Sequence, residues 1–154
     1  SSSAASDVYK RQVQGIENDK ILLVEDYEIN MEIARFVLEN EGAQVQEAWN
    51  GKEAVDLFAA SEPGGYDVIL MDLMMPVMGG LEAAQCIRKL EREDAKTVPI
   101  IAMTANAFAD DEERSLAAGM DAHISKPLDA EKLIQVISDI CKKRKEHAKG
   151  DADI

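Results

Sequence analysis

The chain has 154 residues, of which 46% are hydrophobic, and its 30 acidic and 17 basic residues give a formal net charge of -13. This length and composition suit a single domain that can bury a hydrophobic core without disulfides. The acidic excess argues against nonspecific binding to nucleic acid or to an anionic membrane, because both require a positive field.

The cysteines and the hydrophobic pattern both favour a cytoplasmic protein. Cys86 and Cys141 lie far apart in the chain and form no CxxC pair or metal-ligand spacing, so reduced thiols are expected. No apolar run approaches the ~18 residues needed to span a bilayer. The N-terminus also lacks the layout of a secretory signal. We therefore expect a soluble chain with no membrane contact by this segment.

The two ends of the chain are predicted to lie outside the folded domain. Residues 1–18 are polar and Ser-rich, which indicates a disordered linker or a cloning remnant. Residues 142–154 are predicted to form a charged C-terminal tail, and the basic run 142–145 favours the end of a helix over a binding patch. The domain is therefore expected within residues 19–141.

Short apolar runs alternate with helical patterns between these ends. The run 21–24 predicts a buried strand, and Ile29, Ile33 and Val37 then recur at helical spacing before Gly42. Further strands are expected at 43–49, 67–72, 98–103 and 121–124. Helices are expected in the segments that carry Ala54, Leu57 and Phe58, then Ala83, Ile87 and Leu90, then residues 110–118, and finally Leu133, Val136, Ile137 and Ile140 after an N-cap at Asp129.

Five strand–helix repeats of this kind predict an α/β fold. The sheet is expected to be five-stranded, parallel and doubly wound, because strand–helix–strand units form right-handed parallel crossovers. In such sheets, binding and catalytic groups gather at the carboxyl ends of the strands. Functional residues are therefore expected directly after Val24, Met71, Met103 and Ile124.

Five chemically active residues stand at these strand ends. Glu25 and Asp26 follow the first strand, Asp72 ends the third, Thr104 follows the fourth and Lys126 comes just past the fifth. Clustered carboxylates repel one another and require a cation, and oxygen ligands favour Mg²⁺ or Mn²⁺. With this cation and Lys126 the charges balance, so the site can accept a phosphoryl group on Asp72. Any one of these residues alone would suit a polar turn, a cap or a solvated side chain, but all five together favour a site.

Four motifs surround these residues: Val24-Glu25-Asp26, residues 71–80, residues 101–105 and Ser125-Lys126-Pro127. Together they resemble the receiver domains of two-component response regulators, over nearly all of residues 19–141. The resemblance implies the flavodoxin-like strand order 2-1-3-4-5. Residues 26–30 and 103–107 are most similar to the receivers of hybrid sensor histidine kinases.

The resemblance implies a function for the site. Asp72 is expected to take a phosphoryl group from a phosphohistidine on a partner histidine kinase or histidine phosphotransfer domain. Mg²⁺, or Mn²⁺, is expected to bind Asp26 and Asp72 directly, Glu25 through water and the backbone carbonyl of Met74. The chain is then a phosphoacceptor switch of a two-component system.

Further roles follow from the same resemblance. Thr104 and Lys126 are expected to hold the phosphoryl oxygens, and the Lys126–Pro127 peptide bond is expected to be cis. Met74 and Asn106 are expected to flank the phosphoryl group. Because Met74 is apolar, we expect it to hinder attacking water and to lengthen the lifetime of the acyl phosphate.

The switch is expected to involve Thr104 and His123. His123 stands where the family usually has Tyr or Phe, so it either fills the same steric role or couples switching to pH, since imidazole titrates near neutrality. The face made by residues 106–118, 121–124 and 129–143 is expected to change shape on phosphorylation and to offer a homodimer surface. No direct contact with nucleic acid is expected.

Three other functions fit the sequence less well. A phosphatase of the haloacid dehalogenase type needs a second Asp two residues after its nucleophile, where this chain has Met74. An FMN carrier needs a phosphate-binding loop in place of Glu25-Asp26, and a module that is not phosphorylated would lack site residues. Whether the chain belongs to an enzyme stays open, because it could be a piece of a hybrid histidine kinase that shows only slow self-dephosphorylation.

Overall fold

The structure, a computed structural model, describes residues 15–105 and 109–152, with the side chains of residues 15–105 and 113–144. Strands and helices alternate along this chain, as the sequence predicts, except that a second short helix stands before the fourth strand. The elements are β1 (Lys20–Val24), α2 (Glu28–Asn40), β2 (Gln44–Ala48), α3 (Gly51–Ala60), β3 (Val68–Asp72), α4 (Gly80–Arg88), α5 (Glu93–Thr97), β4 (Ile100–Thr104), α6 (Ala109–Ala117), β5 (Ala122–Ser125) and α7 (Ala130–Ala152).

The five strands form one sheet in the order β2-β1-β3-β4-β5, and the predicted parallel, doubly wound order is confirmed. Each neighbouring pair of strands is parallel. The register pairs Val24 with Met71, and Asp72 with Met103. The carboxyl ends of β1, β3 and β4 therefore meet at one edge of the sheet.

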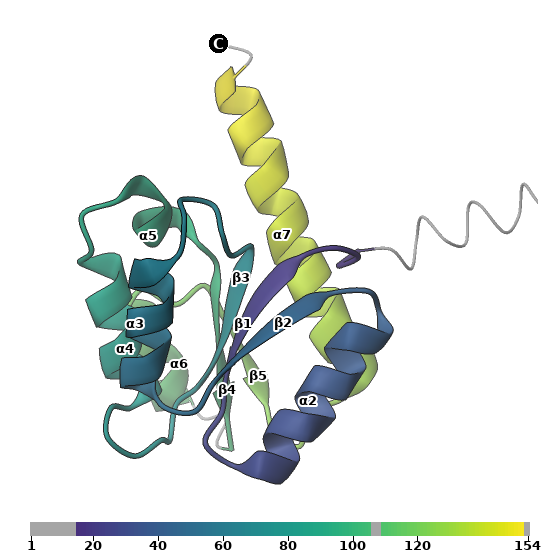
Figure 1. Cartoon of the computed structure of the whole chain (residues 1–154), viewed down its shortest axis with the longest axis vertical. Helices are drawn as coiled ribbons and strands as arrows, with labels where there is room; N and C mark the ends of the chain where they lie inside the picture. The colour runs from purple at the N-terminus through teal and green to yellow at the C-terminus, as the bar shows by residue number, and fades with distance from the viewer. Residues whose placement is uncertain (1–14, 106–108, 153–154) are drawn as a thin grey trace, which may run out of the picture.

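Helices cover the sheet on both faces, and each face has its own hydrophobic core (Figure 1). Alternate residues of the central strands point to opposite sides, so that Leu22 packs toward α3 and α4 whereas Leu23 packs toward α2 and α7. Both side chains are fully buried. Burial of each large apolar side chain stabilises the fold by about 1.5–3 kcal/mol, which explains why β3 is apolar in every position before its last.

Helix α2 is where the sequence predicts, but its buried face is different from the stripe that indicates it. Met31, Ala34 and Leu38 are buried, whereas Ile29 is 54% exposed and Ile33 is 52% exposed. The helix carries two apolar stripes, and packing against the sheet buries only one of them. Helical spacing alone cannot tell which stripe that is.

The ends of the domain and one short helix also differ from the predictions. Ile16 is fully buried, so the core extends beyond the predicted start at residue 19. Helix α5 was not predicted, because five residues are too few to show an apolar period. Helix α7 continues to Ala152, so the basic run from Lys142 lies within the helix and not at its end. No helix in the described ranges is long and apolar enough to cross a membrane.

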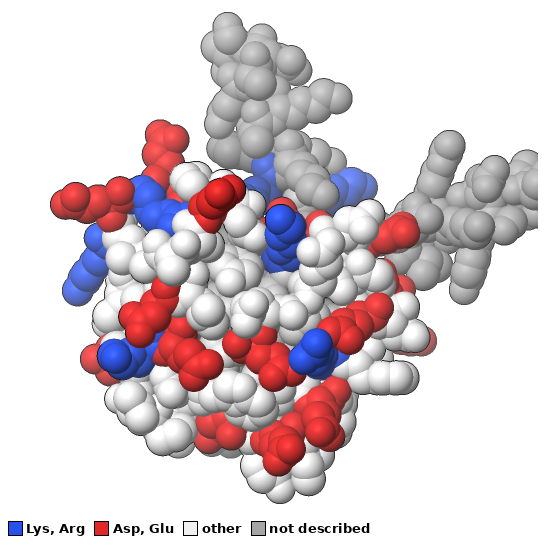
Figure 2. Space-filling model, viewed as in Figure 1, with Lys and Arg blue, Asp and Glu red and all other residues white. Residues whose placement is uncertain are grey.

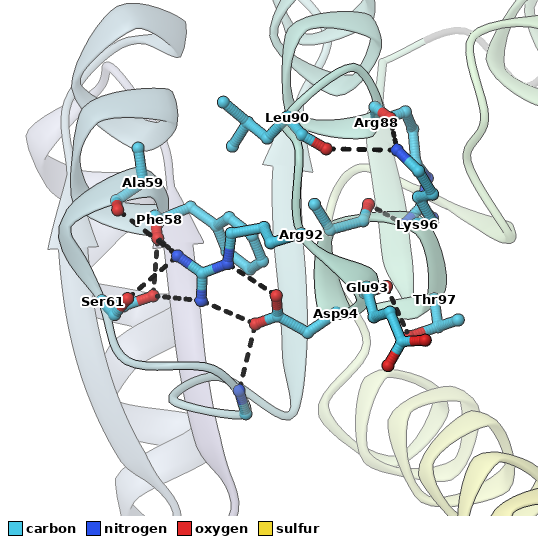
Figure 3. Close-up of polar contacts among 12 residues, drawn as sticks. Phe58, Ala59, Ser61, Arg88, Leu90, Arg92, Glu93, Asp94, Lys96 and Thr97 are labelled. Carbon is cyan, nitrogen blue, oxygen red and sulfur yellow. Dashed lines mark hydrogen bonds and ion pairs between the residues drawn. The ribbon is translucent and has the colours of Figure 1, made fainter.

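One arginine ties the C-terminal end of α3 to the segment around α5 (Figure 3). Arg92 donates hydrogen bonds to the carbonyl oxygens of Phe58 and Ser61, each at 2.9 Å. Its guanidinium also pairs with Asp94 at 2.6 and 2.7 Å and lies 4.8 Å from the centroid of the Phe58 ring. Asp94 in turn accepts from the backbone N–H of Gly64 at 3.0 Å. Arg92 therefore adds hydrogen bonds to carbonyls at the C-terminal end of α3, where the regular intrahelical pattern stops.

We predict that Arg92→Met lowers the free energy of unfolding by about 1–3 kcal/mol, because it removes charge-assisted hydrogen bonds to partners that remain in place. Urea unfolding followed by circular dichroism measures this change. The matched control is Lys52→Met, which removes only an exposed contact to Asp56 at 3.9 Å. The control should change stability by less than about 0.5 kcal/mol. Equal effects of the two substitutions would contradict the role given to Arg92.

Candidate functional site

Three carboxylates meet at the carboxyl edge of the sheet. Glu25 and Asp26 directly follow β1, and Asp72 is the last residue of β3, the neighbour of β1. Each of the three offers an oxygen that lies within 4.8 Å of the other two. The side chains of Glu25 and Asp72 are buried and that of Asp26 is exposed. The predicted convergence of these residues is thus present in the fold.

Lys126 joins this cluster from the loop after β5. Its Nζ donates to Oε2 of Glu25 at 2.8 Å and lies 3.2 Å from Oδ2 of Asp72. The Lys126–Pro127 peptide bond is cis, as predicted. The backbone N–H of Lys126 donates to the carbonyl oxygen of Thr104 at 2.8 Å, which joins the ends of β4 and β5. One ammonium group therefore faces two buried carboxylates.

Burial and charge shift the acid–base properties of this cluster. The pKa of Asp72 is raised, first by burial and then by the neighbouring carboxylate of Glu25, while Lys126 and the N–H of Met74 act in the opposite direction. Burial alone would lower the pKa of Lys126, but its contacts with Glu25 and Asp72 raise it. The cluster therefore holds more negative charge than Lys126 alone can balance.

The donor set fits a hard divalent cation. Oε1 of Glu25 is buried and has no hydrogen-bond partner among the described residues, a costly arrangement for a carboxylate oxygen. A cation bound among the three carboxylates would remove that cost and reduce the repulsion between Glu25 and Asp72. Carboxylate oxygens without His or Cys are the ligands that Mg²⁺ prefers.

Two glycines hold the loop that follows Asp72. A Cβ on Gly80 would lie 2.3 Å from the carbonyl oxygen of Asp72, so only glycine lets α4 begin this close to β3. The N–H of Gly51 donates to the carbonyl oxygen of Met78 at 3.0 Å, and a Cβ there would lie 2.4 Å from the same oxygen. The sequence shows Asn50-Gly51 as a turn, but nothing in it indicates that this turn supports the loop next to Asp72.

The remaining predicted site residues lie as follows. Thr104 is buried at the end of β4, and His123 is half-buried on β5, where it pairs with Ala102. Met74 is 78% exposed, and its backbone N–H donates to Oδ1 of Asp72 at 3.2 Å. Asn106 lies outside the described residues.

We predict that Asp72→Asn raises the free energy of unfolding by about 0.5–2 kcal/mol at pH 7 in the absence of divalent cations. A carboxyl group whose pKa is raised by folding contributes its full stabilisation below its unfolded pKa, and this contribution is lost as the pH rises through the folded pKa. The ionised Asp72 therefore opposes folding at neutral pH, and the advantage of the Asp72→Asn variant should shrink as the pH falls below about 4.

Urea unfolding of the wild type and Asp72→Asn, at pH 7 and at a pH below about 4, measures the difference in the free energy of unfolding. Both experiments include a chelator. The matched control is Asp56→Asn, an exposed aspartate of α3 outside the cluster, which should leave stability nearly unchanged at both pH values. A less stable Asp72→Asn variant at pH 7 would show that the attraction of Lys126 outweighs the repulsion of Glu25.

Solved structures with this fold include receiver domains from several bacteria. The receiver domain of the sensor histidine kinase PA1611 from Pseudomonas aeruginosa aligns with a TM-score of 0.74 at 35% identity, over 81% of this chain and 98% of that one. That structure has a magnesium ion coordinated in its active-site cleft. The chemotaxis protein CheY4 of Vibrio cholerae aligns with a TM-score of 0.73 at 26% identity, over 80% of this chain and 98% of that one.

Sequence relatives are large signalling proteins. The chain is 42% identical over 118 residues to the aerobic respiration control sensor protein ArcB of Escherichia coli, and 38% identical over 126 residues to hybrid signal transduction histidine kinase I of Dictyostelium discoideum. These alignments cover 76% and 80% of the chain but only 14% and 7% of the relatives. The family model of the response regulator receiver domain matches residues 21–138. The chain therefore belongs to the response regulator receiver domain family of two-component systems.

Proposed function

We propose that this chain is a phosphoacceptor switch in which Asp72 takes a phosphoryl group from a phosphohistidine. The observation that supports this most strongly is the buried Asp72 carboxylate, which lies beside two acids and 3.2 Å from the Lys126 ammonium. The donor is a histidine kinase or a histidine phosphotransfer domain, since the relatives are hybrid histidine kinases. Because ATP supplies such kinases, the reaction takes place in the cytoplasm.

Magnesium is the proposed cofactor. Asp26, Asp72 and the Met74 carbonyl would hold it directly and Glu25 through water. This agrees with Oε1 of Glu25, which has no hydrogen-bond partner in the part of the chain that the structure describes, and with the magnesium ion of the PA1611 receiver. When bound, Mg²⁺ supplies positive charge that offsets the carboxylates and the incoming phosphoryl oxygens. Manganese has the same preference for oxygen ligands and can replace it.

Asp72, Lys126 and Thr104 have separate roles in the proposed phosphoryl transfer. An oxygen of Asp72 forms a bond to phosphorus as the bond from phosphorus to the donor imidazole nitrogen breaks, and the imidazole keeps the bonding electrons. Lys126 and the Thr104 hydroxyl hold phosphoryl oxygens, on which negative charge is spread in the transition state. Lys126 is already aimed at the site by its contact with Glu25. The product is an aspartyl phosphate at the end of β3.

The output of the switch is proposed to arise at the face made by α6, β5 and α7. Thr104 lies at the end of β4 and pairs in register with Ser125 of β5, so its movement toward a phosphoryl oxygen can be passed to that strand. His123 is half-buried on the same strand and would fill the steric role of an aromatic residue. The same face is the proposed homodimer surface.

We predict that incubation with acetyl phosphate and Mg²⁺ adds one phosphoryl group to the chain, because the site needs no protein donor for the chemistry itself. Intact mass spectrometry measures the adduct. Asp72→Ala should show none, and a chelator should abolish it in the wild type. Asp56→Ala, which removes an exposed aspartate of α3, is the matched control and should react like the wild type.

Two results would contradict the proposed role of Asp72 as phosphoacceptor. One is an adduct that persists in Asp72→Ala, which would place the reactive carboxylate elsewhere. The other is release of free phosphate over many rapid turnovers without accumulation of the adduct, which would indicate a phosphatase with an aspartate nucleophile.

We predict that Met74→Asn shortens the lifetime of the aspartyl phosphate about tenfold, equivalent to a barrier lower by about 1.4 kcal/mol. The amide can bind and orient a water molecule beside the phosphoryl group, whereas the thioether excludes it. Decay of the labelled protein after removal of acetyl phosphate gives the rate. Met74→Leu keeps an apolar side chain of similar size and should decay like the wild type, and an unchanged rate for Met74→Asn would refute the proposed shielding.

A further inference from the structure

The loop after Asp72 turns some of its side chains inward and others outward. Leu73, Met75 and Met78 pack against the hydrophobic core on the α3 and α4 side of the sheet. Met74 and Val77 point outward, and with 78% and 80% exposure they are the most exposed large hydrophobic residues in the part of the chain that the structure describes. The loop is therefore anchored by its inward residues, and Met74 and Val77 present large apolar side chains on its outer side.

Val77 is also held in a conformation that valine rarely adopts. Its φ is 68°, and the N–H of Met78 donates to the carbonyl oxygen of Pro76 at 2.7 Å, which closes a three-residue turn around it. A β-branched side chain at positive φ is strained, and this form of γ-turn is itself uncommon. Because Val77 is exposed, packing within the fold does not offset the strain. Glycine or asparagine would suit the backbone better.

A strained, exposed valine five residues after a reactive carboxylate indicates a contact made outside the chain. Other exposed apolar residues do not indicate a contact with a partner in the same way. Ile33 and Phe36 lie on the regular helix α2, so their exposure involves no backbone strain and identifies no occupant by itself.

The burial of Asp72 limits how a phosphodonor can approach it. Asp72 is only 4% exposed, and its Oδ1 accepts from the N–H of Met74. A phosphohistidine must bring its phosphorus to bonding distance of the Asp72 carboxylate. The loop that carries the outward residues two and five positions further along the chain follows Asp72 directly, so these two residues can meet the protein surface around that histidine. A small donor such as acetyl phosphate has no such surface.

We infer that Met74 and Val77 form an apolar donor rim, and that Val77 determines how well the site uses a protein phosphodonor with an apolar surface around its phosphohistidine. This inference rests on the proposed function of Asp72. Val77 does not touch the reacting atoms, so it affects binding of the protein donor and leaves the chemistry unchanged. The contact formed in the complex explains why a strained valine stands where glycine would suit the isolated fold.

The test compares two kinds of donor on Val77→Gly. The small donor is acetyl phosphate with Mg²⁺. The protein donor is a histidine kinase phosphorylated from ATP, taken from the relatives above with its own receiver segment removed. The kinase used is one that transfers its phosphoryl group to the wild-type chain. Val77→Gly should react with acetyl phosphate at the wild-type rate and melt at no lower temperature than the wild type. Its KM for the protein donor should rise at least fivefold, with kcat unchanged.

Two control variants separate the side chain from the backbone. Val77→Ile keeps a β-branched apolar side chain and should retain wild-type transfer from the protein donor. Leu116→Ala removes an exposed apolar side chain of α6, which is not part of this loop, and should also transfer normally.

Each other outcome overturns the inference. Equal transfer to wild type and Val77→Gly would show that the rim makes no contact, and equal losses with both donors would make Val77 a residue that positions Asp72. If acetyl phosphate labels the wild type but none of the kinases does, the rim serves no protein donor of this class. If acetyl phosphate does not label the wild type either, the proposed function itself fails.

Discussion

Three carboxylate oxygens, from Glu25, Asp26 and Asp72, lie within 4.8 Å of one another, and two of the side chains are buried. Lys126 contacts both buried carboxylates but supplies only one positive charge. Like charges at this separation raise the free energy of the folded state unless a cation joins them. The cluster therefore persists because the rest of the fold holds these residues in place. Acidic side chains are also numerous over the view of the surface in Figure 2, where basic ones are few.

The sheet supplies that constraint. Its central strands are apolar on both faces, so helices must cover both sides and the strand ends are fixed in register. Asp72 is the last residue of β3, and its carbonyl oxygen lies so close to the start of α4 that only Gly80 fits there. A sheet edge built in this way cannot relax by moving one strand end. The repulsion is retained in the fold, where a bound cation can relieve it.

The sequence predicts the parts of this arrangement that follow from regular structure. Glu25, Asp72 and Lys126 were predicted to converge because parallel strands present their carboxyl ends at one edge, and their contacts confirm it. The sequence does not predict which stripe of α2 is buried, because two apolar stripes satisfy the same helical period. Nor does it show the contact of Gly51 with the Met78 carbonyl, which joins residues far apart in the chain. Such long-range contacts depend on tertiary packing, which local patterns do not contain.

Departures from local rules gather where the proposed chemistry takes place. The buried carboxylates oppose folding through their charge, and Val77 opposes it through its backbone conformation, only five residues from Asp72. A sequence selected for stability alone would have a neutral residue in place of a buried carboxylate and glycine in place of Val77. Both features raise the energy of the isolated domain. In the proposed function, the bound cation would relieve the charge, and the surface of the protein donor would cover the exposed valine. Both features that oppose folding therefore lie at or near the edge of the sheet where a phosphodonor would meet the domain.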